Sequence, residues 1–125
     1  MNIPKTFLYT KSHEWIEVSG TTIKIGITDY AQGELGDICF IEFPELGENF
    51  EKGDVFGVVE AVKTVADLIM PVSGEIININ TDLEENPELI NNEPYKSGWM
   101  IEVRTSDDLT SEDFLRADTY QEIIK

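Results

Sequence analysis

The sequence predicts a mainly β protein with a few short helices, some of them near the C-terminus. Short apolar runs recur along the chain, and Gly, Asn, Asp and Pro separate them at close intervals, as in strands joined by tight turns. Strands of this length and spacing favour a closed all-β body. The chain has 125 residues, 41% of them hydrophobic and 27% charged, so we expect one domain over residues 1–125.

The first predicted unit is a hairpin. Residues 14–18 and 21–27 are rich in β-branched side chains, and the turn dipeptide Ser19-Gly20 separates them. Every second residue from 23 to 27 is isoleucine. Because alternate residues of a strand share one face, we expect this isoleucine face to be buried in the core.

A short helix and another strand are predicted next. Thr28 is a good N-cap residue, Asp29 favours the positive end of a helix dipole, and Gly36 is a typical helix stop. Residues 38–43 are again apolar and end at Pro44, a residue that leaves a sheet easily. We therefore expect a helix of about two turns followed by a strand.

The central segment, residues 56–76, is predicted to be a hairpin with a lysine at its tip. Apolar, β-branched residues flank the dipeptide Lys63-Thr64, which is the most polar point of the segment. Hairpin tips usually need Gly, Asn or Asp, and none stands at this centre. The turn therefore does not require Lys63, although a lysine at a tip is most often only a solvated charge.

Downstream we expect a strand, an acidic turn-rich stretch and a last strand, at residues 76–79, 82–93 and 99–103. The remaining segment, residues 106–125, has the character of a helical tail. It contains two predicted short helices, residues 106–116 and 119–124. Thr119 and Glu122 have the spacing of a capping box, which places a helix start at Thr119.

The charge of the chain limits its partners. It carries 25 acidic against 9 basic side chains, a net charge of −16. Electrostatic repulsion from phosphates excludes a nucleic-acid-binding protein. Partner proteins are expected to present basic surfaces, and the alternative is that the acidity only maintains solubility.

The single cysteine, Cys39, lies in the apolar run 38–43, which predicts a buried and inert thiol. One cysteine cannot form an internal disulfide, and this fits a reducing compartment. The N-terminal segment lacks the apolar core of a signal peptide and the Arg-rich character of a transit peptide, and no apolar run is long enough to span a membrane. We therefore expect a bacterial-type cytoplasmic protein, or a mature form already trimmed, that does not contact membranes.

Lys63 does not have the surroundings of a catalytic nucleophile. Catalytic lysines are desolvated or lie beside another cation, whereas Lys63 is expected at an exposed tip with Glu60 three positions before it. This pattern favours a lysine that is presented to, and modified by, another protein. An enzyme built on His13 and Cys39 is a weak alternative, because neither residue lies in a thiol-protease motif.

The surroundings of Lys63 resemble those of a known family. The hairpin contains Glu60-Ala61-Val62-Lys63, Asp67 and Pro71-Val72-Ser73-Gly74-Glu75, and together these resemble the lipoyl hairpin of the glycine cleavage H proteins. Biotin carriers usually place methionine on both sides of their lysine, whereas Val62 and Thr64 stand here. Further similar motifs cover about residues 9–120: His13-Glu14-Trp15, Gly26-Ile27-Thr28-Asp29-Tyr30-Ala31-Gln32, Leu35-Gly36, Pro94-Tyr95 and Gly98-Trp99-Met100.

The resemblance implies a fold, a cofactor and partners. The fold would be a flattened β-barrel or sandwich of the lipoyl type, a hybrid of the biotinyl- and lipoyl-carrier kind. Lipoate would be attached to Lys63, with Glu60 recognised by the lipoylating enzyme. The protein would itself catalyse no bond change and would carry an aminomethyl group from a pyridoxal-phosphate glycine decarboxylase (P protein) to an aminomethyltransferase (T protein). Dihydrolipoamide dehydrogenase (L protein) would reoxidise the arm.

The resemblance also implies a cleft that shelters the loaded arm, with Glu14 and Asp67 at its acidic positions. The alternative is that both are solvated surface carboxylates. Thr64 and Val65 stand where the family often has alanine, and Ala61 where serine is frequent. These differences leave open an H-like protein that relays lipoyl groups to other complexes, and an acidic adaptor with an unmodified lysine.

Overall fold

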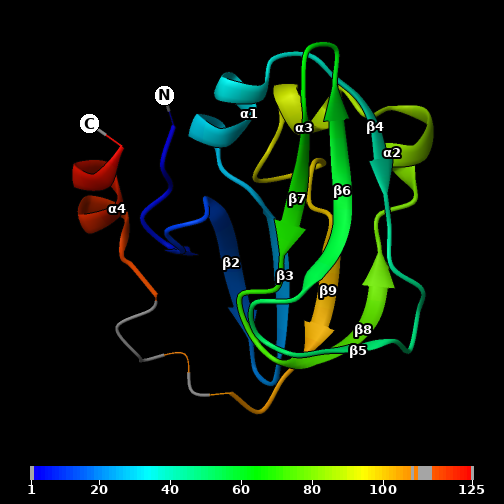
Figure 1. Ribbon diagram of the computed structural model, residues 1–125. Coiled ribbons are helices and arrows are strands. Elements are labelled where there is room, and N and C mark those ends of the chain that lie inside the picture. Colours follow the sequence, from blue (N-terminus) through cyan, green and yellow to red (C-terminus); the bar gives the residue numbers. More distant parts are fainter. Residues whose placement is uncertain (1, 108, 110–113, 125) are drawn as a thin grey trace.

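The computed structural model describes residues 2–107, 109 and 114–124, which form two antiparallel sheets with short helices around them (Figure 1). The strands are β1 (Leu8–Tyr9), β2 (Glu14–Ser19), β3 (Thr22–Ile27), β4 (Ile38–Glu42), β5 (Asn49–Phe50), β6 (Val55–Ala61), β7 (Val65–Ile69), β8 (Gly74–Ile79) and β9 (Ile101–Arg104). The helices are α1 (Asp29–Leu35), α2 (Asp82–Glu85), α3 (Leu89–Asn92) and α4 (Ala117–Ile123).

The larger sheet has the strand order β1-β2-β3-β9-β8-β5, and the smaller one has the order β4-β6-β7. The mainly β prediction with short helices is confirmed. The expectation of a closed body is wrong for the described residues, because the edge strands of the two sheets, β1 and β5 and β4 and β7, do not pair with one another. Hydrophobic patterning reports which face of a strand is buried, but it does not report whether the last strand pairs with the first.

The main core lies between the two sheets. Its buried residues include Ile23 and Ile25 of β3, Val59 of β6, Ile76 of β8 and Ile101 of β9. A second, aromatic cluster lies under α4, where the rings of Tyr9 and Tyr120 stack with centroids 4.9 Å apart; its other buried members are Ile3, Trp15, Leu115 and Ala117. The isoleucine face predicted from the alternation in β3 is therefore buried as expected.

Local signals placed the first elements well. The predicted hairpin is present as β2 and β3, each within one residue of its expected bounds. Helix α1 begins where Thr28 Oγ1 accepts a hydrogen bond of 3.2 Å from the backbone N–H of Ala31. It ends at Gly36, whose φ of 81° is a conformation that suits glycine. Both caps confirm the prediction from sequence.

The C-terminal tail differs from its prediction. The described part of residues 106–116 is not helical, and residues 108 and 110–113 lie outside the described residues. Leu115 instead forms a β-bridge with Tyr9, with hydrogen bonds of 2.8 and 2.7 Å. Helix α4 begins at Ala117, two residues before the expected start at Thr119. Burial of Ala117 and Tyr120 against the aromatic cluster decides this start, and it overrides the capping-box spacing.

The acidic stretch 82–93, predicted as turns, contains the one-turn helices α2 and α3. Each is held by a buried side chain, Leu83 in α2 and Ile90 in α3. Among the described residues no helix is long and apolar enough to cross a membrane.

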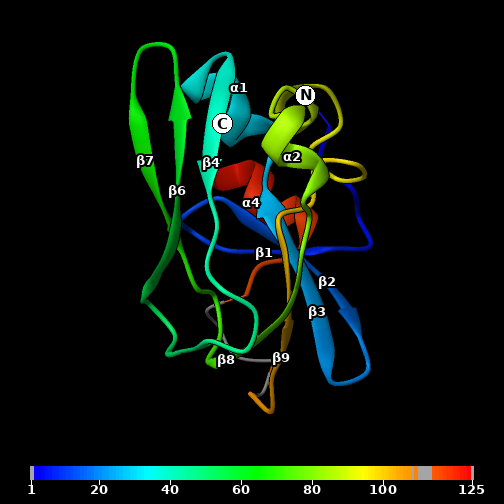
Figure 2. The ribbon, with the colours of Figure 1, turned by 90° about the vertical axis from the view of Figure 1, so that its right-hand side faces the viewer.

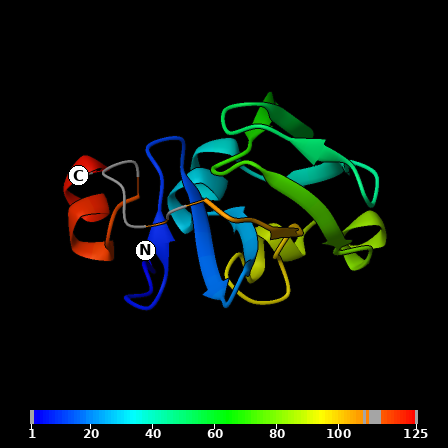
Figure 3. The same ribbon diagram turned by 90° about the horizontal axis from the view of Figure 1, so that it is seen from below.

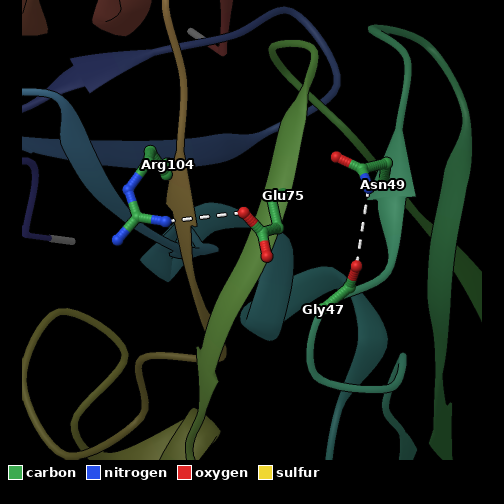
Figure 4. A network of polar contacts seen from close by, with 4 residues as sticks. All are labelled: Gly47, Asn49, Glu75 and Arg104. Atoms are coloured by element: carbon green, nitrogen blue, oxygen red, sulfur yellow. Dashed lines mark hydrogen bonds and ion pairs between the residues drawn. The ribbon is translucent and has the colours of Figure 1, made fainter.

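Figure 4 shows two polar contacts near the β5 edge of the larger sheet, one between strands and one local. Arg104 Nη1 lies 3.4 Å from Glu75 Oε1, across the pair of β9 and β8, and Asn49 Nδ2 donates to the Gly47 carbonyl oxygen at 3.5 Å. The ion pair is largely exposed, so its contribution to stability is small. Seen from below, α4 lies at one end of the molecule, on the far side of β2 and β3 from the smaller sheet (Figure 3).

Cys39 is exposed, so the prediction of a buried thiol is wrong. In β4 the residues Ile38 and Ile41 are both buried, while Cys39 and Phe40 between them both face solvent. The pairing of β4 with β6 shifts register between Ile38 and Phe40, which marks a β-bulge. A bulge adds one residue to the strand and turns two neighbours to the same side, which simple alternation does not anticipate.

Candidate functional site

Lys63 lies in the turn between β6 and β7, as the sequence predicted. Strand pairing ends at Glu60 and Val65, and the backbone N–H of Ala61 donates to the Thr64 carbonyl oxygen at 2.8 Å, which closes the turn. The hairpin runs along one side of the molecule, and its tip projects at one end (Figure 2). The side chain of Lys63 is exposed there. The site thus presents a primary amine to any approaching protein.

The backbone around Lys63 is anchored to the neighbouring chain. The N–H of Val62 donates a hydrogen bond of 3.1 Å to the carbonyl oxygen of Asp37, just before β4. The thiol of Cys39 in β4 donates to the Glu60 carbonyl oxygen, with an S···O distance of 3.4 Å. These contacts hold the turn from the side of β4. The lysine side chain is therefore free to extend while its root is fixed.

The two carboxylates nearest in sequence to Lys63 lie on the outward face of the smaller sheet. Glu60 is half-buried and pairs with Val65 of β7. Asp67 is exposed and lies on the same face of β7 as Val65, two residues further from the tip. Both carboxylates can therefore be reached by a protein that approaches the tip.

Glu14 is buried, in contrast to the other predicted site carboxylates. Only 3% of its surface is exposed, and its Oε1 accepts hydrogen bonds of 2.7 Å from the hydroxyls of Thr10 and Ser12. Burial raises the pKa of the Glu14 carboxyl, and the two hydroxyl donors oppose part of that rise. A cationic partner stabilises a buried carboxylate of this kind, because it replaces the interactions that the carboxylate has lost with water.

Glu14 lines a cavity of about 390 Å³. Its wall is formed by the turn before β2, the loop before β6, the end of β7 and the tail: Thr10, Lys11, Ser12, Lys52, Gly53, Ile69, Met70, Pro71 and Phe114. The fold thus joins Glu14 to the base of the Lys63 hairpin, although 49 positions separate the two residues in sequence. Asp67 is not part of the wall, but it lies two residues before Ile69, which is.

The sequence interpretation missed Thr10 and Ser12. Both reach the Glu14 carboxylate from the turn that precedes β2. The hydroxyl residues at positions 10 and 12 are a visible signal for this network, because Thr and Ser within a few residues of a carboxylate can reach it across a turn.

His13 and Cys39 form hydrogen bonds with different parts of the chain. Nδ1 of His13 lies 2.8 Å from the Tyr120 hydroxyl, and burial lowers the pKa of His13. The Cys39 thiol is bonded to the hairpin backbone instead. His13 also has a positive φ of 72°, rare for a residue other than glycine, and its contact with α4 helps to hold that conformation. These contacts give no support to an enzyme built on His13 and Cys39.

An exposed lysine on an anchored hairpin tip, carried by a packed β body, is an arrangement suited to a carrier domain that holds a prosthetic group on a lysine arm. The comparisons with known proteins identify the group of carriers. The sequence profile described as Glycine cleavage H-protein matches residues 7–125. The chain belongs to this family, whose members are lipoyl-carrying shuttles of the glycine cleavage system.

Individual relatives are similar over nearly their whole length. The chain is 50% identical over 124 residues to the glycine cleavage system H protein of Staphylococcus haemolyticus, covering 99% of this chain and 98% of that protein. It is 48% identical over 124 residues to the H protein of Bacteroides thetaiotaomicron, with the same coverage. The crystal structure of an H protein from Mycobacterium marinum superposes with a TM-score of 0.88 at 37% identity, over 96% of this chain and 97% of that one.

Proposed function

We propose that Lys63 is the lipoyl attachment point and that the chain carries the aminomethyl group of glycine between the enzymes of glycine cleavage. The observation that supports this most directly is the anchored turn that leaves the Lys63 side chain exposed. A carrier needs a fixed root, so that the attached arm is delivered from a defined point. It also needs an amine that a modifying enzyme can reach.

The residues around Lys63 fit an acylated lysine. The deprotonated ε-amine attacks the carbonyl carbon of an activated lipoyl group, the activating group leaves, and an amide forms with loss of one proton. Acylation removes the positive charge of Lys63, and the exposed tip has room for the added chain. Once attached to Lys63, lipoate would supply a dithiolane, whose disulfide can take up the aminomethyl unit on one sulfur and is left as a dithiol when that unit departs. Glu60, half-buried three residues before Lys63, is our candidate for recognition by the lipoylating enzyme.

Glu14 and Asp67 are proposed to receive the loaded arm. Its terminal amine is a cation, and the Glu14 carboxylate, oriented by Thr10 and Ser12, is a buried acceptor for it. An arm seated in the pocket beside Glu14 would exchange part of its contact with water for contact with Ile69, Met70 and Phe114, and water would hydrolyse the carried group. Asp67 is exposed on β7 between the tip and that cavity. Its carboxylate can therefore attract the amine of the loaded arm as the arm folds from the tip toward the cavity.

The chain is proposed to act as a carrier without catalysis of its own, with glycine decarboxylase (P protein), aminomethyltransferase (T protein), dihydrolipoamide dehydrogenase (L protein) and lipoylating enzymes as partners. Attachment to one carrier raises the local concentration of the aminomethyl group at each enzyme it visits. The net charge of −16 favours partners with basic docking surfaces.

The substitution Lys63→Arg tests this proposal. It keeps a long cation at an exposed tip, so the free energy of unfolding should stay within roughly 0.5 kcal/mol of wild type. A guanidinium has no free amine lone pair for acylation, so intact mass should show no added lipoyl group. Glycine decarboxylation and glycine–bicarbonate exchange in a reconstituted system should fall to background.

Lys96→Arg is the matched control, because Lys96 is also exposed but lies outside the hairpin. It should be lipoylated and active like wild type. Exchange near the wild-type rate in folded, unlipoylated Lys63→Arg protein would contradict the carrier proposal. Peptide mapping that found the lipoyl group on Lys52 or Lys96 would contradict the assignment of the site.

A further inference from the structure

The outward face of the smaller sheet exposes apolar side chains next to the lysine tip. Phe40 in β4 is 51% exposed and Val65 in β7 is 58% exposed. Glu60 of β6 is the register partner of both, so the three residues form one row across the sheet. The row ends two residues from Lys63, and Val62 in the turn adds a further apolar side chain that is 74% exposed.

The β-bulge in β4 is the reason that Phe40 faces solvent. In a regular strand Phe40 would share the buried face with Ile38, two residues before it. The register shift between these residues turns Phe40 outward, while Ile41 takes the next buried position. Exposing about half of a phenylalanine side chain forgoes part of the hydrophobic stabilisation that its full burial would give. An exposed aromatic next to a modified lysine suggests recognition by another protein.

Charge on this face has one sign. The strands β4, β6 and β7 contain three carboxylates, Glu42, Glu60 and Asp67, and no lysine or arginine. Glu42 and Asp67 flank Val58 in the row next to that of Phe40. Hereafter the outer sheet face means Phe40, Glu42, Val58, Glu60, Val65 and Asp67. A complementary surface is an apolar recess bordered by lysine or arginine side chains.

We propose that the outer sheet face is the docking surface for the enzyme that acylates Lys63. This inference rests on the proposed function, since it requires Lys63 to be the acylated residue. An enzyme that acts on the ε-amine must bring its active site to the tip and therefore covers the adjoining sheet. Enzymes that act at the far end of an attached arm can dock further from the tip, up to the length of the arm. The partner is thus an acyltransferase or ligase with an apolar recess and a basic rim.

The test measures lipoylation of the unmodified chain by a lipoate ligase with ATP and lipoate, followed by intact mass. Phe40→Ser should lower kcat/KM about tenfold, mainly through KM, which is the effect of losing one anchoring side chain. Val65→Thr should lower it less, because it keeps the shape of the side chain. Controls are exposed apolar residues elsewhere: Leu46→Ser in the loop before β5, and Val18→Thr in β2. Both should stay within about twofold of wild type.

A charge reversal tests the basic rim. Glu42→Lys should raise the KM for lipoylation, and the wild-type KM should rise with salt as screening weakens the attraction, over a Debye length of about 8 Å. The matched control is Glu17→Lys, which changes an exposed strand carboxylate of the larger sheet. The control should leave KM within about twofold of wild type, provided that circular dichroism shows both variants folded.

Equal kcat/KM for wild type and folded Phe40→Ser would overturn this inference and leave the carrier proposal intact. A folded variant of the outer sheet face that is lipoylated normally but fails in glycine decarboxylation would also overturn this inference, because the face would then serve the decarboxylase. A wild-type chain that no ligase acylates at Lys63 would overturn the proposed function itself. Preparing the lipoylated form of each variant, and assaying it with the decarboxylase, separates these outcomes.

Discussion

The hydroxyl of Tyr120 lies 2.8 Å from Nδ1 of His13, and this contact joins the C-terminal helix α4 to the turn that precedes Glu14. The same hydroxyl lies 2.7 Å from Oγ1 of Thr28, the N-cap residue of α1. Burial raises the pKa of Tyr120 to about 12, so the group stays protonated and remains a donor. One phenol therefore connects the tail, the first helix and the turn that leads into the buried carboxylate of Glu14.

Tyr120→Phe should lower the free energy of unfolding by about 1–3 kcal/mol, because it removes the hydroxyl that pairs with both His13 Nδ1 and Thr28 Oγ1. Urea unfolding checks this. Tyr30→Phe is the control: Tyr30 is half-buried and packs against the same His13 ring, but its side chain is not part of this hydrogen-bond network. If both variants unfold at the same urea concentration as wild type, the network does not stabilise the tail.

His13 should make stability depend on pH on the acid side of neutrality. Its folded pKa lies below the ordinary value of 6.5, because burial disfavours the charged ring. As pH falls through 6.5 the unfolded chain takes up a proton that the folded chain does not, so stability is present above 6.5 and is lost as pH falls toward the folded pKa. Urea unfolding from pH 8 to 5 should show this loss.

His13→Asn is the matched variant for that experiment, because asparagine tolerates the positive φ found at this position. It should lose less stability than wild type between pH 7 and 5. An identical pH profile in the two proteins would show that other groups cause the decline.

Glu14→Gln should separate stability from function. The folded pKa of Glu14 is raised, so the stability that its protonated form contributes is present below the ordinary value of 4.5 and is lost as pH rises through the folded pKa. At neutral pH the buried charge is a cost, and glutamine keeps an acceptor for Thr10 and Ser12. The variant should therefore be as stable as wild type or more so at pH 7.

The same substitution removes the proposed partner of the carried amine. Lipoylated Glu14→Gln loaded with the aminomethyl group should release ammonia and formaldehyde faster than loaded wild type, as followed by a formaldehyde assay. Asp67→Asn should have a smaller effect, since Asp67 is exposed. Equal release rates from Glu14→Gln and wild type would mean that the buried carboxylate does not hold the arm.

Substitution by alanine should have opposite effects on stability at two glycines. A Cβ at Gly57 in β6 would overlap the carbonyl oxygen of Glu42 in the paired strand, so Gly57→Ala should cost about 1–3 kcal/mol. A Cβ at Gly33 in α1 meets no atom within 4 Å, so Gly33→Ala should stabilise by about 0.5–1 kcal/mol through helix propensity. Thermal unfolding measures both. A neutral Gly57→Ala would show that β4 and β6 can move apart.

The parts of the fold that sequence predicted depend on neighbours along the chain. The cap at Thr28, the stop at Gly36 and the turn at Lys63 are set by residues within a few positions. The errors arise from contacts between distant segments. Pairing of β4 with β6 creates the bulge that exposes Cys39, and pairing of Leu115 with Tyr9 replaces a predicted helix by a bridge.

The candidate site likewise contains one part that neighbouring residues predict and other parts that depend on distant contacts. The place of Lys63 at a hairpin tip was apparent from the two apolar runs around it, whereas its role as a modified lysine was named from the family resemblance. Glu14 could be named only from the family resemblance, because its burial depends on how the turn before β2 meets the base of the hairpin. The outer sheet face required both the register of three strands and the bulge, and neither can be read from residues 38–67 by alternation.

The hydrogen bond from Val62 to Asp37 has a kinetic consequence. A hairpin whose tip bends freely would add its own excursions to those of an attached arm, and the arm's end would sample a larger volume. With the tip tied to the chain ahead of β4, the end is confined to a shell centred on an almost stationary Lys63. A smaller search volume means more frequent encounters with a docked active site, since effective concentration varies inversely with the volume sampled. Removing this hydrogen bond, for example with Val62→Pro, should slow transfer of the carried group from a correctly lipoylated protein.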